Sequence, residues 1–253
     1  MTPSKRHDLI LEKLRLEGQV RVRELADEFE VTDDCIRKDL ALLSSQKKLK
    51  RIHGGALPIK DNPHALSVGE RLSLLEEEKK AIATKALALI EPGMTIFLDI
   101  STTNIELAKM ILEKKLDITV VTNFVDVLKV LSVSSPVQLI FLGGTLSHSM
   151  DGFTGSMTIE QIRRFHFDLA FLGAVGIDLA DGQITTYDPF DGQTKQAILA
   201  SSNGAYLLAE TKKLNQQGNY IYACPDDFTA WICEGGLSDK EKKQAADCDL
   251  SIL

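Results

Sequence analysis

Apolar residues recur every three or four positions along most of the first 57 residues, which is the spacing of helices that each bury one face. The pattern predicts helices at 5–17, at 24–30 and directly after Thr32, with a short β-rich stretch at 19–22. We expect Thr32 to cap the third helix, because a threonine hydroxyl can accept a hydrogen bond from a free N–H group of the first turn.

The third helix has two faces of different character. Ile36, Leu40 and Leu43 fall at helical spacing and form its predicted buried stripe. The opposite face carries small, polar or basic side chains, namely Asp34, Lys38, Ala41 and Ser45, flanked by Arg37. Such a face suits a helix that lies in the major groove of DNA, where bulk would block approach and positive charge meets phosphate.

Residues 49–56 have the form of a β-hairpin that follows this helix as a wing. Gly54 and Gly55 are expected to supply the positive φ angles of its turn. The pattern therefore predicts a winged helix-turn-helix, with DNA contacts from Thr32, Asp34, Cys35, Arg37, Lys38, Lys50, Arg51 and His53. The alternative is a three-helix module whose basic rim contacts another protein. The agreement of helix order, cap, buried stripe and wing favours DNA.

The distribution of charge supports a division of the chain. The 253 residues have a formal net charge of −7. Residues 1–60 carry 13 basic and 10 acidic side chains, or +3, which leaves 16 basic and 26 acidic side chains, or −10, for the rest. Opposite charges on two segments are typical of a nucleic-acid-binding module joined to a domain with another task. We predict a DNA-binding domain at 1–57, a linker at 58–73 and a second domain at 74–253.

Several other classes of protein are disfavoured. The apolar stretches are too short to span a bilayer, and the first residues contain no apolar signal region, so we expect a cytoplasmic protein without membrane contact. The four cysteines have no C-x-x-C spacing and no nearby histidine pair. We therefore expect neither a disulfide framework nor a metal site, and we predict no cofactor.

From residue 74 onward, a charged helix at 74–90 is followed by apolar β-rich runs that alternate with segments of helical spacing. The strands are predicted at 95–99, 119–122, 138–142, 168–172 and 205–209, and the helices between them at 104–113, 125–131, 157–165 and 194–201. This alternation predicts an α/β domain with a mainly parallel sheet and helices on both of its faces.

Polar and glycine-rich residues follow the predicted strands, at the edge where open α/β sheets bind ligands. Residues 99–103 lead from the first strand into a helix, where hydroxyls and free N–H groups form an anion site. Lys213, after the last strand, is placed to balance a phosphate. The predicted ligand contacts are Asp99, Ser101, Thr102, Thr103, Asn123, Gly143, Gly144, Asp178 and Lys213.

The motifs of both regions resemble those of the DeoR family of bacterial repressors. In the first region these are 19–29, 31–40 and 51–56; in the second they are Asp99–Thr103, Thr122-Asn123, Gly143-Gly144, Asp191 with Lys195, and Glu210 with Lys213. The resemblance covers nearly the whole chain. It implies that the second domain has a ribose-phosphate-isomerase-like fold and senses a sugar phosphate, and it adds Lys195 to the expected effector contacts.

The sequence departs from the family pattern at a few positions. In the first region, the family usually has Ser, Thr and Arg at the positions of Thr32, Cys35 and Lys38. In the second region, Ser101 replaces a glycine. Asp191 stands where the family has a glutamate, and Glu210 stands where it has an aspartate. Lys38 lacks the bidentate guanine contact of an arginine, which affects the operator sequence. Ser101 restricts how closely the backbone approaches a ligand.

Three functions fit these observations. The first is a repressor of a carbohydrate-metabolism operon, without catalytic residues, that a sugar phosphate releases from double-stranded operator DNA. The second is a sugar-phosphate isomerase with an appended DNA-binding module, in which Asp178, Asp191, Glu210 and Lys213 are the candidate acids and bases. The third is a phosphate-binding interaction domain with no role on DNA.

The attached DNA module favours the repressor, because an isomerase would not need one, whereas in a repressor the bound ligand changes the affinity for DNA. One winged module makes too few contacts for a specific genomic site. We therefore expect a homo-oligomer, a dimer or a tetramer, that binds repeated half-sites.

Overall fold

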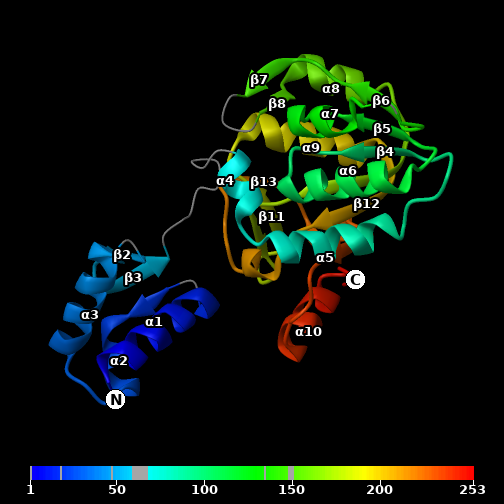
Figure 1. The fold of residues 1–253 in the computed structure, drawn as a ribbon. Coiled ribbons are helices and arrows are strands. Elements are labelled where there is room, and N and C mark those ends of the chain that lie inside the picture. The colour runs from blue at the N-terminus through cyan, green and yellow to red at the C-terminus, as the bar shows by residue number, and fades with distance from the viewer. Residues whose placement is uncertain (1, 18, 47, 59–67, 134, 148–150) are drawn as a thin grey trace. The chain divides into compact units, whose positions relative to one another are not determined.

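The computed structural model describes residues 2–17, 19–46, 48–58, 68–133, 135–147 and 151–253. The chain divides into two compact units, Met1–Asp61 and Asn62–Leu253 (Figure 1). Each unit has its own hydrophobic core and is described by itself below.

The first unit combines three helices with a small antiparallel sheet. Its elements are α1 (Pro3–Glu17), β1 (Val20–Arg21), α2 (Val22–Glu28), α3 (Asp33–Ser45), β2 (Leu49–Ile52) and β3 (Gly55–Pro58). The strand order is β1-β3-β2. Ile36, Leu40 and Leu43 are buried in the core, as the helical spacing predicts. Thr32 caps α3, as expected, because its Oγ1 accepts a hydrogen bond from the Cys35 N–H group at 3.3 Å.

The turn of the wing differs from the prediction at one of its two glycines. Gly54 has a φ of +79°, but Gly55 is not among the residues with a positive φ. A Cβ atom at Gly55 would lie 2.1 Å from the carbonyl oxygen of Val20. Gly55 is therefore needed for the close approach of β1 to β3 rather than for the turn.

A six-stranded parallel sheet forms the centre of the second unit. Its order is β14-β12-β9-β4-β5-β6, with bounds β14 (Ala230–Ile232), β12 (Ser202–Leu208), β9 (Phe167–Gly173), β4 (Thr95–Leu98), β5 (Thr119–Thr122) and β6 (Gln138–Phe141). Every neighbouring pair is parallel. The prediction of a mainly parallel α/β domain is confirmed.

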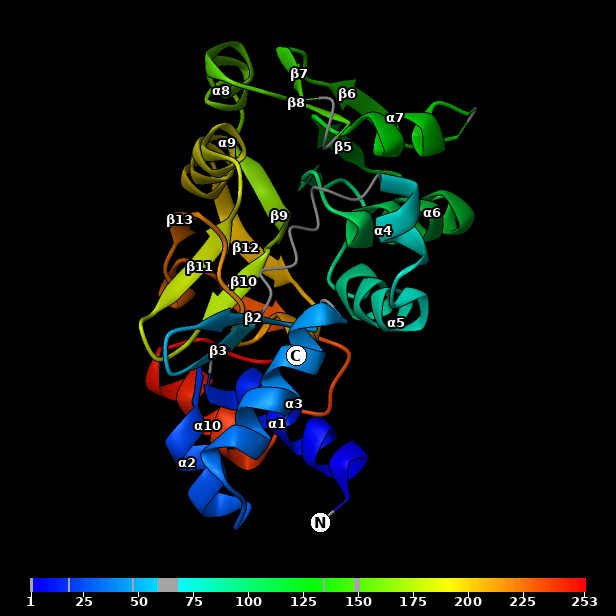
Figure 2. The same ribbon diagram turned by 90° about the vertical axis from the view of Figure 1, so that its left-hand side faces the viewer.

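Helices cover both faces of this sheet (Figure 2). One face packs against α5 (Glu76–Leu87), α6 (Thr102–Lys114) and α7 (Val125–Leu131), and the other against α8 (Ser156–Ile162) and α9 (Pro189–Ala200). The first layer buries Ile82, Ile111 and Val127, and the second buries Ile162 and Ile198. The two faces therefore carry separate apolar clusters.

Several short elements accompany the sheet. They are α4 (Val68–Ser73), the hairpin β7 (Thr145–Ser147) and β8 (Gly152–Thr154), the antiparallel sheet β10 (Gly176–Asp178), β11 (Gln183–Thr186) and β13 (Tyr220–Ala223), the 3-10 turns η2 (Thr211–Lys213) and η3 (Pro225–Asp227), and α10 (Asp239–Asp247). Helix α4 lies within the segment 58–73 that the sequence predicts as a linker, and it packs against α6. In the described part of the chain, no helix has the length and apolar character to cross a membrane.

Candidate functional site

The order of strands reverses between β4 and β9. After β4 the chain adds β5 and then β6 on one side, and after β9 it adds β12 and then β14 on the other. In open α/β sheets, ligands bind at such a switch point, in a crevice outside the carboxyl ends of the strands. Asp99 directly follows β4, and Gly173 is the last residue of β9. The topology therefore centres the candidate site on these two residues.

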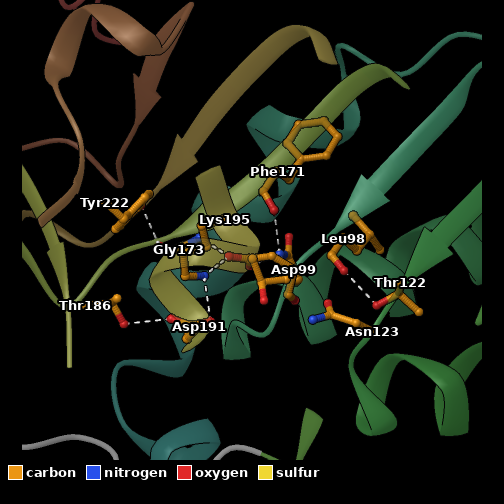
Figure 3. A network of polar contacts seen from close by, with 12 residues as sticks. Leu98, Asp99, Thr122, Asn123, Phe171, Gly173, Thr186, Asp191, Lys195 and Tyr222 are labelled. Atoms are coloured by element: carbon orange, nitrogen blue, oxygen red, sulfur yellow. Dashed lines mark hydrogen bonds and ion pairs between the residues drawn. The ribbon is translucent and has the colours of Figure 1, made fainter. Parts of the chain in front are cut away.

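A buried polar network occupies this point (Figure 3). The Asp99 Oδ2 atom accepts a hydrogen bond from the Gly173 N–H group at 2.9 Å and forms an ion pair with Lys195 of α9. The Lys195 Nζ atom also lies 3.6 Å from Asp191 Oδ1, one helical turn earlier. The Thr186 hydroxyl donates to Asp191 Oδ2 at 2.7 Å. Segments that are far apart in the sequence thus converge on one cluster.

The cluster holds one ammonium group between two carboxylates. Burial raises the pKa of Asp99, and the attraction of Lys195 offsets only part of that rise. Burial lowers the pKa of Lys195, but Asp191 and Asp99 outweigh it and raise this pKa above its ordinary value. Burial and the same carboxylates raise the pKa of Tyr222, whose hydroxyl donates to the Gly173 carbonyl at 2.9 Å. Lys195 therefore stays charged and Tyr222 stays neutral.

Asn104 belongs to this network, although the sequence analysis did not single it out. Its fully buried side chain donates through Nδ2 to Asp99 Oδ1 at 2.7 Å and to the Phe171 carbonyl at 2.9 Å. Asn104 thereby fixes the orientation of the Asp99 carboxylate from the first turn of α6. An amide five residues after a strand-terminal aspartate is the signal that points to it.

The N-terminus of α6 faces the same edge with unsatisfied polar groups. Ser101 is the N-cap residue, but its side chain makes no capping hydrogen bond. Within the described residues, the buried Oγ1 of Thr103 and the buried Oδ1 of Asn123 have no hydrogen-bond partner. The first turn of a helix also leaves backbone N–H groups free and concentrates positive potential there. The arrangement suits an anion that also carries hydroxyl groups.

The two glycines after β6 lie beside α8. The Gly143 carbonyl accepts hydrogen bonds from Thr158 Oγ1 at 3.0 Å and from Gln161 Nε2 at 2.9 Å, both on α8. Gly144 has a φ of +157°, and a Cβ atom there would lie 2.0 Å from Thr158 Oγ1. Gly144 therefore lets this loop pack closely against α8, whereas a Cβ atom at Gly143 would meet no atom within 4 Å. Contact of either glycine with a ligand stays a prediction.

Two further predicted contacts form other interactions. Asp178 Oδ1 accepts from two backbone N–H groups of the turn that follows β10, at 3.0 Å each, and its Oδ2 accepts from Gln217. Lys213 Nζ lies 2.8 Å from Glu210 Oε2. Among the described residues, no hydrogen bond or ion pair joins Asp178 or Lys213 to the Asp99 network. Their part in ligand binding also stays a prediction.

In the first unit, the predicted DNA contacts lie on α3 and on the wing. Cys35 is half-buried, and the other seven, Thr32, Asp34, Arg37, Lys38, Lys50, Arg51 and His53, are exposed. A shallow hollow joins the two elements and is lined by Arg37, Arg51 and His53. Arg37 of α3 thus lies beside Arg51 and His53 of the wing, and the contact of the predicted residues with DNA stays a prediction.

Arg37 is paired on this surface. Its guanidinium lies 2.7 Å from Asp34 and 3.2 Å from Asp33, in the first turn of α3. Both pairs are exposed to solvent, where such interactions are weak and screened by salt. Arg37 can therefore exchange these carboxylates for phosphate at little cost.

A buried ion pair holds α3 against α1, and sequence reasoning missed it. Asp39 accepts from Arg6 at 2.5 Å and 3.1 Å and lies 2.9 Å from His7 Nε2. Burial raises the pKa of Asp39, but the bonds from Arg6 and His7 outweigh it and hold this pKa below its ordinary value. The sequence feature that could have revealed this buried pair is the position of Asp39, which falls in the apolar stripe three residues after Ile36.

Comparison with known proteins settles the family. The DeoR-like helix-turn-helix domain matches residues 6–62, and the DeoR C terminal sensor domain matches residues 75–235. The chain belongs to the DeoR family. As a member of that family it is a DNA-binding transcriptional regulator, and the two matches cover α3, the wing and the carboxyl ends of β4 and β9.

Two curated repressors are similar to this DeoR-family chain over most of their length. The glycerol-3-phosphate regulon repressor of Escherichia coli (strain K12) is 32% identical over 216 residues, 85% of this chain and 84% of the relative. The lactose phosphotransferase system repressor of Lactococcus lactis subsp. lactis is 32% identical over 218 residues, 85% of each protein. Among solved structures, ribose 5-phosphate isomerase A from Methanocaldococcus jannaschii aligns with 55% of this chain and 54% of its own, at 17% identity and a TM-score of 0.41.

Proposed function

We propose that this DeoR-family regulator represses a carbohydrate operon from its operator and is released when a sugar phosphate enters the crevice at the switch point. The observation that carries the proposal is the convergence of the Asp99 network with the free N-terminus of α6. Regulation of this kind requires that the ligand binds the DNA-free state more tightly than the DNA-bound state.

The chemistry of the crevice supports a phosphorylated carbohydrate. The start of α6 offers N–H groups and the Thr103 hydroxyl to phosphate oxygens. The free Oδ1 of Asn123 can accept a hydrogen bond from a sugar hydroxyl. The names of the two relatives, which refer to glycerol 3-phosphate and to a sugar phosphotransferase system, agree with this class of ligand.

On DNA, the exposed cations of α3 and of the wing would contact the backbone and the base edges of one half-site. Because one winged module buries little surface, we propose that two or four copies bind repeated half-sites together. We place the protein in the bacterial cytoplasm, with the chromosome.

A thermal unfolding screen tests the choice of ligand. Trp231 is the one tryptophan of the sequence and is fully buried in the second unit, so its fluorescence reports unfolding of that unit. Glycerol 3-phosphate, glucose 6-phosphate and fructose 6-phosphate are each compared with the unphosphorylated parent. A matching sugar phosphate at 100 times its dissociation constant should stabilise the unit by about 2.7 kcal/mol. Stabilisation by the parent compounds alone would contradict the proposal.

The buried pairing of Asp99, Lys195 and Asp191 also favours a second candidate, a sugar-phosphate isomerase, because acid–base chemistry uses such groups. Incubation of the purified protein with each sugar phosphate, followed by NMR, tests it. Turnover that Lys195→Met abolishes would establish the enzyme. Binding without turnover supports the sensor.

A further inference from the structure

Arg71, a half-buried residue of α4, has two guanidinium nitrogens that are buried without a partner. Its Nε and Nη2 atoms are shielded from solvent, and neither has a hydrogen-bond partner among the described residues. Burial lowers the pKa of Arg71 in spite of three nearby carboxylates. Burying such donors without a partner is unfavourable, so the position calls for a bound acceptor.

The surroundings of Arg71 place it at the crevice edge of the second unit. The carboxylates that attract it are Asp151, Asp191 and Asp126. Asp126 and Asp191 lie in the first turns of α7 and α9, and Asp151 directly precedes β8. Helix α4 also packs against α6, as Figure 2 shows. Arg71 therefore faces the segments that follow the carboxyl ends of the parallel strands.

These neighbouring carboxylates do not satisfy the guanidinium. Asp191 already accepts from the Thr186 hydroxyl and faces Lys195, and Asp126 pairs with Lys129 at 2.9 Å. In the described part of the chain none of the three acids forms a hydrogen bond with Arg71. The planar fork of an arginine matches two oxygens of a phosphate, which makes a phosphoryl group the best-fitting acceptor.

The backbone that carries Arg71 is held in place. Lys79 of α5 is buried and donates through Nζ to the carbonyl of Arg71 and to the carbonyl of Leu74 at 2.6 Å. These two bonds fix the corner between α4 and α5. Arg71 is thus presented from an anchored corner, which reduces the entropy lost when it binds a ligand.

From these observations we propose that Arg71 binds the phosphoryl group of the effector together with the N-terminus of α6. The inference rests on the proposed function and adds a contact that the strand-end pattern does not contain. Helix α4 is also the first described element of the second unit after the segment that joins it to the DNA-binding unit. A ligand held by Arg71 would therefore act on the element closest along the chain to that connection.

Binding of inorganic phosphate to the full chain tests the assignment, with calorimetry and Trp231 fluorescence as readouts. Arg71→Gln should weaken phosphate binding by about tenfold to a hundredfold, and Arg71→Lys should retain part of it. Arg163→Gln, which changes an exposed arginine of the same unit, should leave it unchanged. Equal phosphate affinity in the wild type and Arg71→Gln, or no phosphate binding by the wild type, would overturn the proposal.

The effect on DNA separates this inference from the proposed function. Arg71→Gln should bind DNA as the wild type does but should not be released by a sugar phosphate that releases the wild type. Normal release of Arg71→Gln would overturn the role of Arg71 and leave the proposed function standing. Arg71-dependent phosphate binding that never changes DNA affinity would support the site and contradict the proposed function.

Discussion

At the scale of single residues, both units depend on buried charges whose partners come from distant positions. Asp39 binds Arg6, 33 residues away, and Asp99 binds Lys195, 96 residues away. A buried charge is tolerated when it is paired and hydrogen-bonded, and it destabilises the fold when its partner is removed. These pairs therefore fix which helices and strands lie together.

Replacing Asp39 tests whether its buried ion pair with Arg6 stabilises the first unit. Asp39→Asn leaves Arg6 buried with a neutral partner and should lower the free energy of unfolding by about 3–5 kcal/mol. Because every tryptophan and tyrosine lies beyond residue 186, far-UV circular dichroism must report on this unit, while Trp231 fluorescence should be unchanged. The control Asp33→Asn breaks an exposed pair and should cost at most about 1 kcal/mol. Similar losses for both variants would contradict the assignment.

Lys79 gives a prediction for pH dependence. Burial lowers the pKa of Lys79 to about 8, below its ordinary value of 10.5. Between these two values the unfolded chain binds a proton that the folded chain does not, so Lys79 stabilises the fold increasingly as pH rises through this range. The difference in free energy of unfolding between wild type and Lys79→Met should therefore shift in favour of the wild type from pH 7 to pH 10. A difference independent of pH, measured by Trp231 fluorescence, would contradict this.

Residue patterns predict part of the site and omit the rest for a physical reason. Asp99 and Ser101 follow from the rule that ligands bind at strand ends, and Lys195 follows from the family resemblance. The sequence does not predict Asn104 or Arg71 as site residues, because their roles depend on burial among segments that are distant in the sequence. Local pattern shows where polar groups gather, but only packing shows which of them are left without a partner.

At the scale of elements, long and strongly patterned segments are predictable. Five of the six parallel strands and the helices α6, α7, α8 and α9 agree with the predicted segments to within a few residues at most ends, whereas the pattern does not predict β14. Strands of three residues, as in β7, β8 and β10, are too short to show alternation. Helix α10 is polar, but Ser238 and Glu241 form a capping box that would have revealed its start.

The surface of α3 gives a prediction at this scale. Arg37→Ala combined with Lys38→Ala should weaken DNA binding and lower the slope of log affinity against log salt by about 2, since each lost phosphate contact removes about one ion. Lys242→Ala with Lys243→Ala removes two exposed lysines from the second unit and is the matched control. An unchanged slope in the α3 variant, measured by fluorescence anisotropy, would place the DNA surface elsewhere.

At the scale of the whole molecule, the charge of each segment matches its task. The positive segment contains α3 and the wing, and the acidic remainder contains the parallel sheet with its polar edge. Composition alone predicts two regions with different partners. Release by an effector requires more than this, namely that a ligand bound to the second unit changes the affinity of the first unit for DNA.

That coupling is tested most directly by the affinity of the full chain for a duplex that it selects from a random pool, measured with and without the sugar phosphate that stabilises it. We expect the sugar phosphate to lower DNA affinity at least about fivefold, within the usual range of allosteric coupling, and the unphosphorylated sugar to leave it unchanged. Equal DNA affinity with and without a bound sugar phosphate would contradict this expectation.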